Sequence, residues 1–138
     1  MNQQLVQAIR KLRLSGLLSS LELRLQEASS HAIPHEQFLE LIFQDELNAR
    51  AQRLIEKRRK NACFRDPKSL EDFDWNFNPT IKRQQIYQLA TCAFVRERRD
   101  LLFLGPPGLG KSHIAQGIGL AAIRAGFDVL YRSIFDLV

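Results

Sequence analysis

LLFLGPPGLGKS, residues 101–112, is the stretch that decides which fold this sequence predicts. Its first part, Leu101–Leu104, is a short apolar run, typical of a strand buried on both faces of a parallel sheet. Its second part, Gly105–Ser112, matches the pattern G-x-x-x-x-G-K-[ST]. A helical pattern then runs from Lys111 to about Ala125, and Asp128–Arg132 has the character of a second strand. Strand, loop, helix and strand in this order predict a βαβ unit of an α/β fold.

The glycine-rich loop has the chemistry that a triphosphate requires. Its glycines let the backbone curl until successive N–H groups point at phosphate oxygens. The Lys111 ammonium can reach the β- and γ-phosphates, and the Ser112 hydroxyl can ligate Mg²⁺. We therefore predict a site for ATP and Mg²⁺, with Ser112 as metal ligand. The predicted nucleotide-binding residues are Gly105, Pro106, Pro107, Gly108, Leu109, Gly110, Lys111, Ser112 and His113.

Hydrolysis of ATP needs further groups that the sequence does not predict. A P-loop ATPase holds Mg²⁺ with an acid at the end of a second strand and orients the attacking water. No apolar run ending in Asp or Glu follows Arg132, and Asp136 is better explained as the partner of Ser133 in a capping box. Whether the protein is an enzyme stays open, no catalytic residue is predicted, and we expect this chain alone not to turn over ATP.

The region before the loop predicts a helical N-terminal domain, residues 1–65, ahead of a partial P-loop domain, residues 66–138. Apolar residues recur at helical spacing in three segments before residue 61. The turn signals Asp66-Pro67 and Asn78-Pro79 bound a stretch without that period. Within it, Phe73, Trp75 and Phe77 alternate with polar residues, which favours an extended segment. Its aromatic rings are expected to anchor the core, and stacking on adenine is the less favoured alternative. A further helix is expected from about Ile81 to Val95.

Composition places the chain among ordinary globular proteins. Of its 138 residues, 45% are hydrophobic and 25% charged. No apolar run approaches the roughly 20 residues that span a bilayer. The N-terminus lacks the pattern of a signal peptide, and the two cysteines have no metal-type spacing. We therefore expect a cytoplasmic protein without a membrane partner.

Positive charge is concentrated in the N-terminal half. Residues 1–65 hold 11 Lys and Arg against 7 Asp and Glu, while the whole chain has a net charge of +5. Many of these charges cluster at the end of the third predicted helix. Contact with DNA phosphates explains such a cluster, and so does a solvated helix end whose cations interact favourably with the C-terminal helix dipole. The sequence leaves both explanations open. The residues concerned, at the end of the third helix, are Arg50, Arg53, Lys57, Arg58, Arg59 and Lys60.

Several of these segments together resemble the IstB-like ATP-binding family. The resemblance covers nearly the whole chain, and the acidic and aromatic stretch upstream of the loop makes it more specific than a P-loop alone. The stretches that carry it are Leu12–Leu25, Glu36–Leu39, Leu70–Trp75, Leu89–Thr91 and Leu101–Ser112 with His113 and Ala115.

The family resemblance implies an AAA+ ATPase that helps a bacterial insertion sequence to transpose. Its expected partners are ATP, DNA, the transposase of the same insertion sequence and further copies of itself. Phosphate-loop roles carry over only to Gly105, Gly108, Gly110, Lys111 and Ser112. The family's Walker B acid, sensor and arginine finger would lie beyond Val138, so the resemblance implies a truncated, non-hydrolysing fragment.

Two alternatives to a transposition helper remain at the level of sequence. The family is similar to DnaC-type helicase loaders, and nothing in the sequence separates the two roles. In a third reading the chain is a non-catalytic DNA- or protein-binding fragment whose P-loop is a relic. Nucleotide binding by the purified chain separates the third reading from the first two.

Overall fold

The computed structural model describes residues 1–65 and 68–137, which form two compact units, Met1–Leu54 and Ile55–Val138. The predicted boundary at residues 65 and 66, and the turn expected at Asp66-Pro67, fall on or beside residues 66 and 67, which lie outside the described residues. None of the described helices is both long and apolar enough to cross a membrane. The elements in order are α1 (Gln3–Lys11), α2 (Ser15–His31), α3 (His35–Ala62), η1 (Leu70–Asp72), α4 (Arg83–Leu89), α5 (Ala93–Arg96), α6 (Lys111–Arg124) and η2 (Ile134–Leu137), where η marks a 3₁₀ helix.

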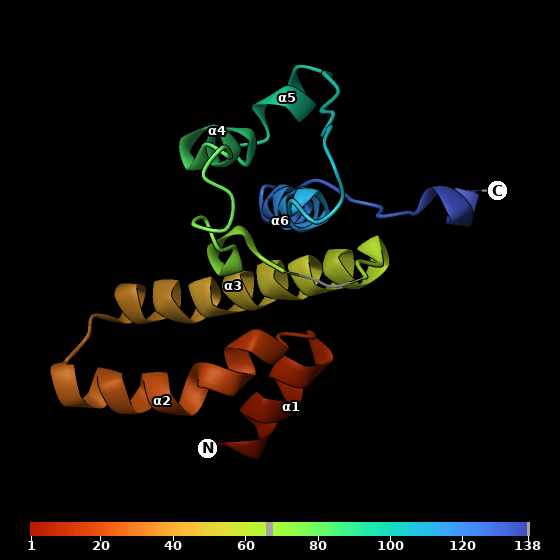
Figure 1. Cartoon of the computed structure of the whole chain (residues 1–138). Helices are drawn as coiled ribbons and strands as arrows, with labels where there is room; N and C mark the ends of the chain where they lie inside the picture. The colour runs from red at the N-terminus through yellow and green to blue at the C-terminus, as the bar shows by residue number, and fades with distance from the viewer. Residues whose placement is uncertain (66–67, 138) are drawn as a thin grey trace. The chain divides into compact units, whose positions relative to one another are not determined.

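The first unit is a helical hairpin of α2 and the N-terminal part of α3, with α1 packed against α2 (Figure 1). Its core is formed by Ile9, Leu17, Leu21 and Ile42, all less than a tenth exposed. Gly16 allows the hairpin helices to approach closely, because a Cβ there would lie 2.4 Å from the Cβ of Ala49. The helical N-terminal region predicted from apolar periodicity is therefore present.

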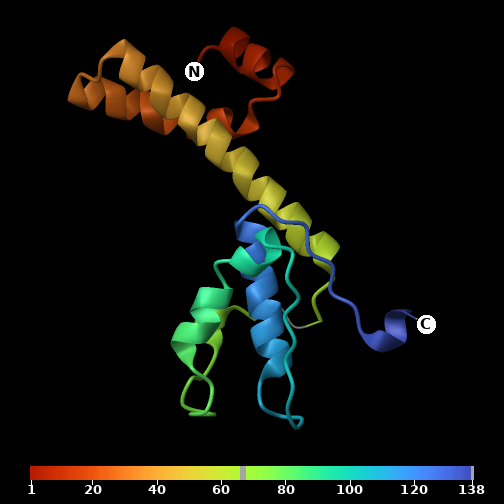
Figure 2. The same ribbon diagram turned by 90° about the horizontal axis from the view of Figure 1, so that it is seen from above.

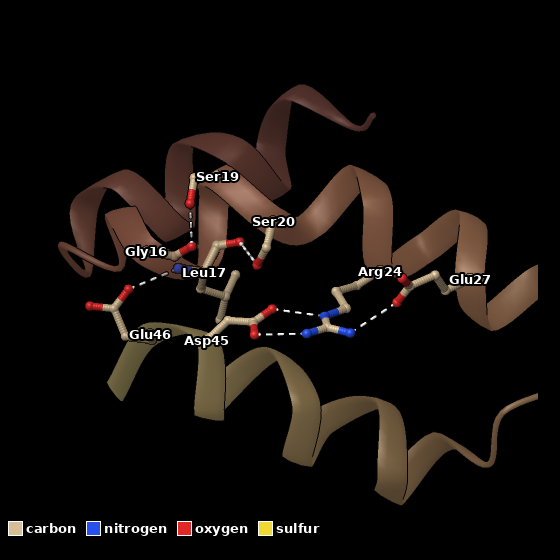
Figure 3. Close-up of polar contacts among 8 residues, drawn as sticks. All are labelled: Gly16, Leu17, Ser19, Ser20, Arg24, Glu27, Asp45 and Glu46. Carbon is tan, nitrogen blue, oxygen red and sulfur yellow. Dashed lines mark hydrogen bonds and ion pairs between the residues drawn. The ribbon is translucent and has the colours of Figure 1, made fainter. Parts of the chain in front are cut away.

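Polar contacts also join α2 to α3 within this unit (Figure 3). Arg24 binds both carboxylate oxygens of Asp45, at 2.8 and 2.9 Å, and donates a further bond of 2.9 Å to Glu27. The carboxylate of Glu46 accepts a hydrogen bond of 2.9 Å from the N–H of Leu17. Bidentate pairing fixes the geometry of two groups, so these contacts set the register of the hairpin.

The second unit is built around α6. Figure 2 shows the segment before the loop running alongside this helix, with α4 nearby. Ile114 and Ile118 of α6 pack with Leu70, Phe73 and Ile86 to form the core. The helix ends where predicted, since Ala125 closes it and Gly126 follows with φ +99°. The predicted capping box is also confirmed, because the N–H of Ser133 donates to Asp136 at 2.9 Å.

The predicted parallel sheet is wrong, because no β-strand occurs among residues 1–65 and 68–137. Leu101–Leu104 is extended but unpaired, and the exposed fractions of Leu102 and Leu104 are 77% and 83%. The second expected strand, Asp128–Arg132, runs instead past the end of α3, where the Tyr131 N–H donates to the Ala62 carbonyl at 2.8 Å. Apolar character favours a strand, but a strand forms only when neighbouring backbone satisfies its hydrogen bonds.

The helix expected from Ile81 to Val95 is two short helices, α4 and α5. The chain turns at Cys92, which has φ +61° and is fully buried. The expected extended segment over Phe73–Phe77 is a turn, since the Phe77 N–H donates to the Asp74 carbonyl at 3.2 Å. This turn is a local feature, because the Asp74 carboxylate also accepts a hydrogen bond of 3.0 Å from the Asn76 N–H.

Candidate nucleotide-binding site

The loop Gly105–Ser112 joins the extended run Leu101–Leu104 to the first turn of α6 (Figure 2). Leu101 and Phe103 pack on the core of the unit, which anchors the chain just before the loop. Gly108 and Gly110 have φ of +83° and +87°, a conformation that side chains with a Cβ rarely adopt. Glycine at these two positions therefore gives the loop its curl.

The ammonium of Lys111 lies over the loop. Its Nζ donates hydrogen bonds to the carbonyl oxygens of Gly105 and Pro106. A lysine that begins a helix and folds back over the preceding loop holds a positive charge above the loop backbone. An anion bound in the curl would therefore meet this ammonium.

The N-terminus of α6 supplies the second half of the site. This helix has 14 residues and begins at Lys111, and its first internal hydrogen bond joins the Ile114 N–H to the Gly110 carbonyl at 3.0 Å. The N–H groups of the first turn have no acceptor within the helix, so they are suited to bind an anion. Ser112 is exposed in this turn, where its hydroxyl can reach a bound cation.

Phe73 closes the loop on the side of the core. A Cβ on Gly110 would lie 2.6 Å from Cε2 of the Phe73 ring, so the ring occupies the space that any other residue would fill. His113 also faces this ring, at 5.0 Å between ring centroids, and its Nε2 lies 2.9 Å from the Ser69 carbonyl oxygen. The His113 side chain thus binds the segment before η1. The sequence placed Phe73 in the core but did not predict its contact with Gly110.

The family model described as IstB-like ATP binding protein matches residues 7–138. This chain belongs to the IstB-like family. The match extends through both compact units and includes the whole candidate loop. The resemblance carried by the loop and by the acidic and aromatic stretch before it is therefore confirmed.

Individual relatives of this IstB-like chain come from several bacteria. A protein of Pseudomonas aeruginosa named for ATP binding in insertion sequence IS21 is 37% identical over 93% of this chain and 48% of its own length. An insertion-sequence ATP-binding protein of Mycobacterium tuberculosis is 32% identical, over 90% and 49%. One of Geobacillus stearothermophilus, from IS5376, is 33% identical, over 80% and 44%. The chain spans about half the length of these relatives.

Of the two other aromatic residues predicted to anchor the core of this IstB-like chain, one packs against the core and one is exposed to solvent. Trp75 is partly buried and packs against the core, with its ring 4.8 Å from that of Phe73. Phe77 is 64% exposed, so its assignment to the core is wrong. The guanidinium of Arg83 lies 5.7 Å from the Trp75 ring and 5.5 Å from that of Tyr87. Only the first two aromatic residues of the predicted row therefore anchor the unit.

Most of the basic residues that were predicted to bind DNA already have acidic neighbours in the IstB-like structure. Arg50 and Arg53 pair with Glu46, at 2.7 and 3.6 Å. Arg58 pairs with Asp128 at 3.0 Å, and Arg59 lies 4.0 Å from Glu56. No ion pair of Lys57 or Lys60 occurs within the part of the chain that the structure describes. These pairs reduce, but do not remove, the positive charge of this helix end.

Proposed function

We propose that this chain binds ATP with Mg²⁺ through Gly105–Ser112 and serves as an ATP-binding helper of DNA transposition. The observation that carries ATP binding is the geometry of the loop: two glycines in the left-handed region, the Lys111 ammonium above the backbone, and the start of α6 behind it. Membership of an ATP-binding family supports the same assignment. Its role in transposition is supported by relatives that are named for insertion sequences.

The Lys111→Ala variant tests the phosphate loop. Loss of a charge-assisted contact to phosphate should weaken ATP binding about tenfold or more. Titration with labelled ATP measures the affinity, and Lys82→Ala, which removes an exposed lysine of the same unit, is the matched control. Equal affinities of wild type and Lys111→Ala would refute the assignment.

The Mg²⁺ ligand has a separate test. If Ser112 holds the ion, Mg²⁺ should tighten ATP binding by the wild type and have less effect on Ser112→Ala. Ser133→Ala serves as control, because that hydroxyl accepts a hydrogen bond from the Phe135 N–H at the start of η2. The same Mg²⁺ dependence in wild type and Ser112→Ala would remove Ser112 from the metal site.

The basic end of α3 is proposed to contact DNA phosphates. Neutralising Lys57, Arg58, Arg59 and Lys60 together should weaken binding to a duplex of arbitrary sequence and flatten its salt dependence. The matched control neutralises Arg96, Arg98 and Arg99, a second basic cluster of the same unit. Unchanged DNA affinity in the α3 variant, measured at two salt concentrations, would exclude this helix end.

Partnership with a transposase distinguishes a transposition helper from a helicase loader. The proposed helper should co-purify with the transposase of its own insertion sequence when both are expressed together. A parallel expression with the replicative helicase of the same host is the control. Retention of the helicase and not of the transposase would overturn the proposed role while leaving ATP binding intact.

A further inference from the structure

The segment from Ser69 to Phe73 contacts the first half of α6 and its N-cap residue, Gly110, at three points. The Leu70 side chain fills the space beside Gly117, where a Cβ would lie 2.7 Å from the leucine Cδ2. The Ser69 carbonyl is 2.9 Å from Nε2 of His113. Because a carbonyl only accepts hydrogen bonds, this histidine nitrogen carries the donated proton. The third point is the Phe73 ring against Gly110.

The contact of Phe73 with Gly110 differs from the other contacts of the core. Leu70, Ile114 and Ile118 pack side chain against side chain or against the helix itself. Phe73 instead touches a loop glycine whose φ is +87°, and Phe73 itself is only 7% exposed. A glycine has more backbone freedom to lose than any other residue, so a ring packed against it reduces the freedom of the loop before a ligand binds.

We propose that Phe73 is a positioning residue for the phosphate loop. Its ring, held between His113 and Trp75, keeps Gly110 in the conformation that receives the triphosphate. This inference rests on the proposed ATP binding and extends it to a residue more than 30 positions before the loop. The ring contact also links the loop to Trp75, because Phe73 contacts both Gly110 and the indole, with a ring distance of 4.8 Å to the indole.

Trp75 makes the proposal measurable, since it is the single tryptophan of the chain. Its indole contacts Phe73 on one side and lies 5.6 Å from the Tyr87 ring on another. A ligand that changes Gly110 should move the Phe73 ring and alter the surroundings of the indole. We therefore expect the fluorescence of Trp75 to change saturably as ATP and Mg²⁺ are added to the full chain.

The experiment compares Phe73→Leu with Ile86→Ala. Ile86 belongs to the same core cluster, and its loss creates a cavity on the α4 side. Each variant is first melted by circular dichroism, and ATP affinity is measured with labelled nucleotide at a temperature where all chains are folded. Phe73→Leu should bind ATP roughly tenfold more weakly and lose most of the Trp75 signal. Ile86→Ala should melt at a lower temperature than the wild type but keep both the ATP affinity and the Trp75 fluorescence change.

His113 provides a second pair of variants. His113→Gln keeps an N–H that can reach the Ser69 carbonyl, whereas His113→Leu keeps apolar volume without a donor. We expect the glutamine variant to retain ATP affinity better than the leucine variant. Equal affinities in this pair would remove the hydrogen bond to Ser69 from the positioning of the loop.

The outcomes separate the inference from the function on which it rests. Wild-type affinity in folded Phe73→Leu overturns the role of Phe73 while ATP binding stands. If the wild type binds labelled ATP and the fluorescence of Trp75 does not change, the link between the loop and the indole is overturned. Absence of ATP binding by the wild type overturns the proposed function, and the inference falls with it. If Phe73→Leu does not fold, Phe73→Met, which preserves more of the buried volume, is judged by the same criteria.

Discussion

At the scale of the residue, Glu46 shows how one carboxylate can replace a missing helix cap. Leu14 precedes α2 and makes no side-chain hydrogen bond to its first turn. Glu46, which is 3% exposed on α3, accepts the Leu17 N–H instead and also receives a 2.7 Å hydrogen bond from Arg50. The Arg50 guanidinium and then the Leu17 N–H lower the pKa of this carboxyl. A buried charge is tolerated here because the Leu17 N–H and the guanidinium groups of Arg50 and Arg53 surround it.

Two substitutions of Glu46 should separate the contribution of its negative charge from that of its hydrogen bond to the Leu17 N–H. Glu46→Gln keeps an oxygen for the Leu17 N–H but loses the ion pairs, whereas Glu46→Leu leaves the N–H without an acceptor. We expect both variants to melt below the wild type, and the leucine variant to melt lowest. Glu22→Gln, at an exposed position of α2, is the control. A leucine variant as stable as the glutamine variant would show that Glu46 does not act as a cap.

Asp45 gives the first unit a predictable response to acid. The hydrogen bonds from Arg24 lower the pKa of this carboxyl from 3.8 to about 2. Because the pKa is lower in the folded chain, the stabilisation is complete above about pH 4 and is lost as the pH falls from about 4 to about 2. In Asp45→Asn this part of the acid destabilisation should be absent. Melting curves of both chains across that range provide the test, and parallel pH profiles would contradict it.

At the scale of the element, α6 is a helix whose glycines are contact points. The Leu70 side chain packs against Gly117, and the Phe64 ring packs against Gly119. A Cβ added to Gly119 would lie 2.9 Å from Cζ of Phe64. Glycine inside a helix costs roughly 0.5–1 kcal/mol relative to alanine. Close packing of the preceding segment against the backbone compensates for this cost. One face of the helix therefore packs closely because its residues are glycines. A search for hydrophobic periodicity does not detect such a face.

Gly117→Ala should destabilise the second unit in spite of the better helix propensity of alanine. The new Cβ would meet Leu70 at 2.7 Å, and overpacking typically costs about 1–3 kcal/mol. In a Leu70→Ala background the same substitution should cost less, because the obstructing side chain is gone and only the backbone nitrogen of residue 70, 3.2 Å from the added Cβ, stays close. Chemical denaturation of the four chains of this cycle measures the coupling. Additive effects would mean that Leu70 does not restrict position 117.

At the scale of the whole molecule, the chain is two compact units with α3 contributing to both. The contacts of the candidate loop, through Phe73, Ser69 and Leu70, lie within the second unit. The ion pair between Arg24 and Asp45 lies within the first. The stability of the first unit and the proposed nucleotide affinity of the second are therefore expected to depend on different sets of contacts.

Asp45→Asn should consequently destabilise the first unit without changing ATP affinity. The lost bidentate pair removes a partner of Arg24 and lowers the melting temperature, and the loop contacts remain as they are. Labelled ATP binding below the melting transition is the measurement, with Lys111→Ala as the variant expected to lose affinity. Loss of affinity in folded Asp45→Asn would show that the loop depends on the hairpin.

By itself, the sequence determined the features that depend on neighbouring residues. The spacing in Gly105–Ser112 predicted the loop and the start of α6, and the family indicated by the loop together with the segments before it is confirmed. Helical periodicity located α3, and the capping box at Ser133 and Asp136 was read from two positions three apart. Each of these rests on chemistry within one turn or one loop, which is why the order of residues alone was sufficient.

The tertiary structure alone decided the features that depend on distant partners. The run Leu101–Leu104 was apolar enough for a strand, but strand formation requires hydrogen bonds from backbone elsewhere in the chain, and the described residues place none beside it. Glu46 caps a helix 29 residues earlier, and the Phe73 ring lies against Gly110, 37 residues later. Such contacts are set by how helices pack, and packing depends on the shapes of many side chains together.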